Sequence, residues 1–121
     1  MTKRTGPLNI VLRKTADEFV RLYKSTGSGL WRDVAEHLIK PTRKRVVVNV
    51  SKINRYADEG DIIVVPGKVL GSGRIEKKVT VAAFAFSDKA IEKIRRAGGK
   101  TITLSELVRD NVEPRNVKLL V

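Results

Sequence analysis

Basic side chains are the residues of this sequence whose type and spacing could do chemistry. The 121 residues hold 25 lysines and arginines against 13 aspartates and glutamates, which gives a formal net charge of +12 at pH 7. Between Lys40 and Arg55 the chain carries six cations and no acid. A small protein with such an excess repels itself unless something neutralises it, so we expect a polyanionic partner: RNA, DNA or an acidic membrane surface.

A membrane is the weakest of these partners. No apolar run approaches the roughly 20 residues that a membrane-spanning helix needs. The first residues, Met1–Pro7, are polar, and no hydrophobic core of a signal peptide follows them. We therefore expect nucleic acid as the partner.

The sequence offers no set of residues for catalysis. It has no cysteine, and its one histidine is His37, so disulfides and zinc sites built from cysteine and histidine are excluded. The carboxylates are scattered over turns and helix faces, and the serines stand where helix caps belong, which leaves no nucleophile paired with a base. We expect no enzyme activity, no cofactor, no metal and no small-molecule substrate.

Two helices are expected at the start of the chain, behind a basic arm over residues 1–6. Apolar residues at three- and four-residue spacings predict a helix from Pro7 to about Lys24 and a second from Leu30 to Lys40, with Ser28 as its N-cap. Arg13 and Lys14 make the first half of the first helix cationic. The residues expected to face inward on the second helix are Leu30, Trp31, Val34, Leu38 and Ile39.

The remainder, residues 41–121, is predicted to be an α/β body to which the helical pair (7–40) is an appendage, all in one domain. The expected strands are Val46–Val50, Ile62–Val65, Val79–Phe86, Thr101–Thr103 and Val117–Val121. The expected helices are a short one capped by Ser51, Asp88–Ala97 capped by Ser87, and a turn over Ser105–Arg109. The helix Asp88–Ala97 has basic residues near its C-terminal end, namely Lys93, Arg95 and Arg96. They partly compensate the helix dipole, so we rank them below the loop cations as contacts of a partner.

The sharpest local signal is the glycine-rich stretch Pro66–Arg74, PGKVLGSGR. Its glycines permit close backbone approach, and Lys68 and Arg74 bracket them with charge, so the stretch is suited to a sugar-phosphate backbone. A plain hairpin connection explains the same residues equally well. A nucleotide-binding P-loop is excluded here, because no glycine of this stretch is followed by Lys-Ser or Lys-Thr. The acidic turn Asp58–Asp61 is expected to pair with nearby arginines.

The few aromatic residues argue against a single-strand binder. Trp31 stands at helical spacing with Val34 and Leu38 and is predicted to be core, as are most of the other aromatics, so little is left on which bases could stack. A helix-turn-helix is disfavoured because the second helix offers mainly the acids Asp33 and Glu36 on its exposed side. A DNA-compacting or other nucleic-acid-binding protein remains the alternative to one that binds structured RNA.

Three ordered blocks resemble a known family. They are LWRDVAEHLIKPTRKRVVVNVSKI (Leu30–Ile53), GDIIVVPGKVLGSG (Gly60–Gly73) and VTVAAFAFSDKA (Val79–Ala90). Over nearly the whole chain the sequence is similar to the L18e family of large-subunit ribosomal proteins of archaea and eukaryotes, which is related to bacterial ribosomal protein L15. The short termini resemble the archaeal members.

The resemblance implies an α/β fold, an irregular superhelix of β-β-α units behind an N-terminal helical pair. It implies a structural constituent of the large ribosomal subunit, in the cytoplasm, that binds and stabilises ribosomal RNA beside neighbouring ribosomal proteins, with no catalysis and no cofactor. The RNA-facing matches that it implies are Lys3, Arg4, Arg43, Lys44, Arg45, Asn49, Lys52 and Arg55, and the loop residues Lys68, Gly71, Ser72, Gly73 and Arg74. We add four cations from the chain itself: Arg13, Lys14, Lys77 and Lys78.

Overall fold

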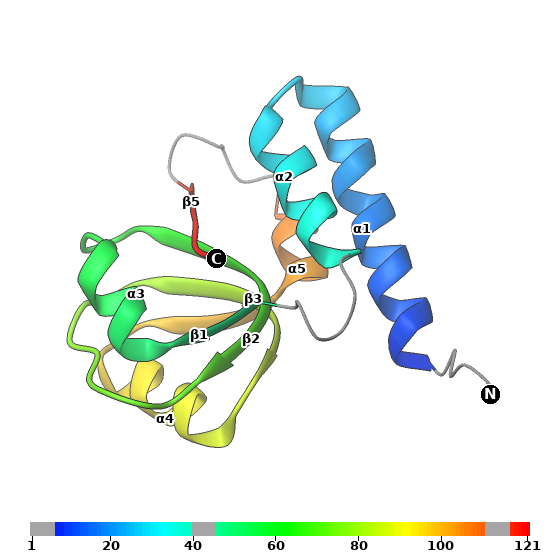
Figure 1. Ribbon diagram of the computed structural model, residues 1–121. Coiled ribbons are helices and arrows are strands. Elements are labelled where there is room, and N and C mark those ends of the chain that lie inside the picture. The colour runs from blue at the N-terminus through cyan, green and yellow to red at the C-terminus, as the bar shows by residue number, and fades with distance from the viewer. Residues whose placement is uncertain (1–6, 40–45, 111–116) are drawn as a thin grey trace.

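The computed structural model describes residues 7–39, 46–110 and 117–121, with side chains from residue 13 onward in the first helix. Helices and strands alternate along most of the chain (Figure 1). In chain order the elements are α1 (Pro7–Thr26), α2 (Gly29–Leu38), β1 (Val46–Asn49), α3 (Val50–Tyr56), β2 (Ile62–Leu70), β3 (Thr80–Phe86), α4 (Asp88–Arg96), β4 (Lys100–Thr103), α5 (Leu104–Arg109) and β5 (Val117–Leu119). The predicted α/β class is confirmed.

The strands form one parallel sheet in the order β1-β2-β3-β4. β5 pairs with the first half of β2, from Ile62 to Val64, while β1 pairs with its second half, from Gly67 to Leu70. Every pairing in the described sheet is parallel. Parallel neighbours need a crossover connection, so the alternative of a plain hairpin after β2 is wrong.

Both faces of the sheet are covered, as a parallel sheet requires. One core cluster joins the sheet to α3 and α4 through residues such as Val48, Ile53 and Ile94. The other joins it to α1, α2 and α5, and includes Phe19, Trp31 and Val64. Figure 1 shows the two groups of helices on opposite sides of the sheet. The helical pair therefore shares a core with the sheet and is not an appendage to it.

β2 is twice as long as its apolar run predicts. The strand continues through Pro66 and Gly67 to Leu70, with a shift of register against β3 between Val65 and Lys68. Proline donates no hydrogen bond, but a β-bulge leaves one residue unpaired and so accommodates it. Gly67 is also required there, because a β-carbon would run into the carbonyl of Val46 on β1. Half of the predicted glycine loop is thus strand.

Several element ends differ from the prediction by one or two residues. β1 ends at Asn49, and Val50 is the first residue of α3, so Asn49 and not Ser51 holds the N-cap position. α2 ends at Leu38, and Ile39 beyond it is 65% exposed, so the expectation that Ile39 faces inward is wrong. Ser28 stands at the N-cap of α2, but its side chain makes no capping hydrogen bond.

Other local predictions are confirmed. Trp31 is 1% exposed and packs against Phe19, with ring centroids 5.8 Å apart. The Ser87 hydroxyl accepts a hydrogen bond from the Ala90 N–H at 3.2 Å and caps α4. Gly98, with φ of 90°, follows the end of that helix in a conformation that favours glycine. These caps fix the direction in which α4 crosses the sheet.

Candidate nucleic-acid interface

The cations predicted to meet a polyanion fall into three groups. The first lies outside the described residues, and its prediction stays untested: Lys3, Arg4, Arg43, Lys44 and Arg45. The second is exposed to solvent and consists of Arg13, Lys14, Arg55, Lys68, Arg74 and Lys78. The third is used by the fold itself.

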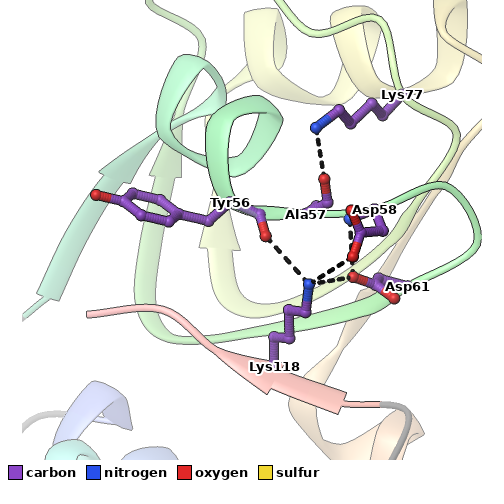
Figure 2. Close-up of polar contacts among 6 residues, drawn as sticks. All are labelled: Tyr56, Ala57, Asp58, Asp61, Lys77 and Lys118. Carbon is purple, nitrogen blue, oxygen red and sulfur yellow. Dashed lines mark hydrogen bonds and ion pairs between the residues drawn. The ribbon is translucent and has the colours of Figure 1, made fainter.

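The third group contains two half-buried lysines. The Lys52 ammonium donates to the main-chain oxygen of Val121 at 2.6 Å, and the Lys77 ammonium donates to the Ala57 carbonyl at 2.6 Å. Figure 2 shows the hydrogen bond from Lys77 to Ala57, which is the C-cap residue of α3. Each ammonium has three N–H donors, so these lysines hold the chain together and still have donors left.

Arg74 is an exposed cation of the glycine loop. Its side chain is 85% exposed, and its guanidinium lies 3.7 Å from the carboxylate of Glu76, which is itself 69% exposed. A surface ion pair of this kind contributes about 0 to 1 kcal/mol. Arg74 can therefore exchange Glu76 for a phosphate at little cost.

The loop itself is held rigidly between α3 and α4. Gly71 is buried, and a β-carbon there would lie 2.6 Å from the Lys89 β-carbon. Gly73 has φ of 90° and lies against Ser51 of α3. The Lys93 ammonium donates to the carbonyls of Gly71 at 2.6 Å and Gly73 at 2.7 Å. Packing thus accounts for both glycines, and the exposed residues left for a partner are Ser72, Gly73 and Arg74.

Asn49, which only the family resemblance implied, occupies an unusual position. It ends β1 at the N-cap of α3, and its side chain makes no capping hydrogen bond. Its Oδ1 is buried and has no hydrogen-bond partner among the described residues. The described residues therefore show no hydrogen bond through which the Asn49 Oδ1 stabilises the fold.

The acidic turn after α3 pairs with a lysine, contrary to the expectation of arginines. The Lys118 ammonium on β5 lies 3.1 Å from the Asp58 carboxylate and 2.9 Å from that of Asp61, and it donates to the Tyr56 carbonyl at 3.2 Å (Figure 2). Hydrogen bonding to Lys118 lowers the pKa of Asp61 from its usual value, and the bond to Asp61 raises the pKa of Lys118. The network ties the end of the chain to the start of β2.

Sequence reasoning missed the structural roles of Lys93 and Lys118. Both are single lysines in ordinary amphipathic patterns, and the carbonyls and carboxylates that they bind lie 20 or more residues away along the chain, so no local signal identifies them. It also placed most aromatics in the core, whereas Tyr56 is 52% exposed. Figure 2 shows the Tyr56 ring directed away from the Lys118 network.

The described ranges offer neither a metal site nor a membrane span. Within them, no three histidine, cysteine, aspartate or glutamate residues come together in a way that could hold a metal ion. None of the helices described is both long enough and apolar enough to cross a membrane. The chemistry that the described surface offers is therefore that of exposed cations on a rigid frame.

Comparison with known proteins decides the family. Residues 30–102 match the family of ribosomal proteins 50S-L15, 50S-L18e and 60S-L27a. The chain belongs to this family. The resemblance seen in the three sequence blocks is thereby confirmed, and the chain is a structural constituent of the ribosome and not an enzyme.

Relatives from archaea are similar over nearly their whole length. The large ribosomal subunit protein eL18 of Methanothermobacter thermautotrophicus is 49% identical over 120 residues, which is 99% of both chains. The proteins of the same name from Pyrobaculum aerophilum and Sulfurisphaera tokodaii are each 44% identical. The match covers 97% of this chain and 96% of the first protein, and 99% of this chain and 98% of the second.

Proposed function

We propose that this protein binds and stabilises folded large-subunit ribosomal RNA through its basic loops and arms. It does so as a single-domain constituent of the large ribosomal subunit in the cytoplasm. The observation that carries the proposal is the glycine loop, where Arg74 stands 85% exposed on a backbone clamped by Lys93. The relatives are each named as a large ribosomal subunit protein, which supports the large subunit as the particle to which this chain belongs.

The mechanism is electrostatic and depends on shape. Lysines and arginines neutralise phosphates where RNA strands approach each other, and each neutralised phosphate releases counterions. The parallel sheet, covered on both faces, holds the exposed cations of the loop at fixed separations. Double-stranded RNA is recognised mostly through its shape and its backbone, so a rigid set of cations provides the selectivity.

The test is binding of the full chain to protein-free large-subunit ribosomal RNA of Methanothermobacter thermautotrophicus, the organism of the 49% identical relative. Affinity is measured over a series of KCl concentrations and compared with affinity for duplex DNA of mixed sequence. We expect tighter binding to the ribosomal RNA. Equal or tighter binding to DNA would favour the alternative of a DNA-compacting protein.

A variant sharpens the test. Changing Arg43, Lys44 and Arg45 to alanine should weaken RNA binding and flatten the slope of log affinity against log salt by about 0.7 to 0.9 for each phosphate that the variant no longer neutralises. The thermal transition serves as the control for folding. If affinity and slope both stay unchanged, this basic block does not contact the RNA.

A further inference from the structure

A groove lies between the segment that follows β2 and the second half of α4. It is open to solvent and has a volume of about 800 Å³. Its lining residues come from the two segments, Gly73, Arg74, Ile75 and Glu76 from the first, and Lys93, Arg96 and Ala97 from the second. The groove thus brings Arg74 of the glycine loop beside Lys93 and Arg96 of α4, which are distant in the sequence.

We propose that this groove binds the sugar-phosphate backbone of an RNA strand, with Arg74 and Arg96 contacting phosphates from its two sides. The inference rests on the proposed function and adds a site to it. Arg96 and Lys93 are among the cations that sequence reasoning attributes to the dipole of α4, so the site depends on what the fold brings together.

Charge favours a phosphate in this groove. Three cations line it against one carboxylate, that of Glu76. The C-terminal end of α4 also borders the groove, since Arg96 and Ala97 line it, and the partial negative charge at a helix C-terminus, about half an elementary charge, opposes an anion there. Three full positive charges outweigh these two contributions, even when the Glu92 carboxylate beside Arg96 is added to them.

The two arginines are available for exchange. Arg96 is 74% exposed and lies 2.8 Å from the Glu92 carboxylate one turn earlier, and the contact of Arg74 with Glu76 is longer, at 3.7 Å. Surface pairs of this kind are worth about 0 to 1 kcal/mol. A phosphate offers an arginine two parallel N–H···O bonds, and such charge-assisted bonds are stronger than neutral ones.

Lys93 gives the site its rigidity. Its ammonium uses two of its three donors on the carbonyls of Gly71 and Gly73. The loop that carries Arg74 is therefore fixed to the helix that carries Arg96. The groove also has an apolar part, formed by Ile75, which is 8% exposed, and the half-buried Ala97.

The test compares Arg96→Ala with a matched control. The control is Arg32→Ala on α2, which also removes one positive charge from an ion pair within a helix. Arg32 and Glu36 are four residues apart, their charged groups lie 3.3 Å from each other, and both side chains are exposed. The groove variants are Arg74→Ala, Arg96→Ala and the double change. Each is titrated with the protein-free ribosomal RNA of the binding test between about 50 and 200 mM KCl, the range over which phosphate contacts show their salt dependence.

We expect Arg74→Ala and Arg96→Ala each to reduce the slope of log affinity against log salt by about 0.7 to 0.9. Over the fourfold salt range, the factor by which affinity decreases should then be about threefold smaller for each variant than for the native chain. Arg32→Ala should keep the slope of the native chain, and all variants should melt within a few degrees of it. If the groove variants behave as Arg32→Ala does while the native chain binds RNA with a steep slope, the groove proposal is wrong and the proposed function stands. If the native chain itself binds without salt dependence, both are wrong.

Discussion

Changing Gly71 to alanine should destabilise the protein, because the glycine is required by packing against α4. A β-carbon at this position would lie 2.6 Å from the Lys89 β-carbon and 2.8 Å from the Ala90 nitrogen. The first distance is 0.8 Å short of the 3.4 Å at which ordinary contact begins. The Ala90 nitrogen belongs to the backbone of α4, so the loop or the helix must move.

The size of the effect follows from the cost of overpacking a well-packed interior, about 1 to 3 kcal/mol for one extra methyl group. The unfolding entropy of globular proteins is about 2.1 cal/mol/K per residue. For 121 residues the destabilisation therefore lowers Tm by about 4 to 12 °C. Differential scanning calorimetry of the full chain measures this shift directly.

Gly29→Ala is the matched control. A β-carbon at Gly29 would meet nothing within 4 Å, and the residue is the first of α2. Alanine is the better helix former by up to about 1 kcal/mol, so the control should melt at the native temperature or slightly above it. If the two variants melt alike, the loop does not pack against α4 as described, and the rigid placement of the loop cations is refuted.

Three other variants test the frame. Lys118→Met removes the cation shared by Asp58 and Asp61; because the pKa of Asp61 is lowered in the folded state, its contribution is present above about pH 4 and is lost as pH falls through the folded pKa. Urea unfolding at pH 7 and pH 3 should thus show a smaller loss of stability on acidification in the variant than in the native chain, and equal losses would contradict the pairing. Val48→Asp places an unpaired carboxylate where the side chain is 1% exposed, so the cooperative thermal transition should disappear; a normal transition would show that the core is assigned wrongly. Lys93→Met removes two charge-assisted bonds and should cost about 1.5 to 3 kcal/mol with faster amide exchange in the glycine loop, whereas unchanged exchange would show that the ammonium does not hold the loop.

Most elements of the fold could be predicted from the sequence because their signals are local. Pro7 and the apolar spacing after it mark the start of α1, and the hydroxyl of Ser87 marks the start of α4, where it caps the helix. β2 shows the limit of such signals. Pro66 and Gly67 are typical of a loop, and only the bulge against β3 and the close approach of β1 make them part of a strand.

The candidate site was predictable in composition but not in geometry. Lys68 and Arg74 could be named from charge and glycine spacing, and the structure places both at the surface. Lys93 could not be assigned to the loop, because its bonds to the carbonyls of Gly71 and Gly73 depend on how α4 crosses the sheet. The meeting of Arg74 and Arg96 in one groove depends on the same crossing.

The most direct test of the central claim, that the chain is an RNA-bound constituent of the large subunit, is sedimentation of the native protein from cell lysate through sucrose gradients at low and at moderate salt. We predict that the protein migrates with large subunits and stays with them at moderate salt. Migration at the top of the gradient, or with chromosomal DNA, would show that it is not a constituent of the large subunit.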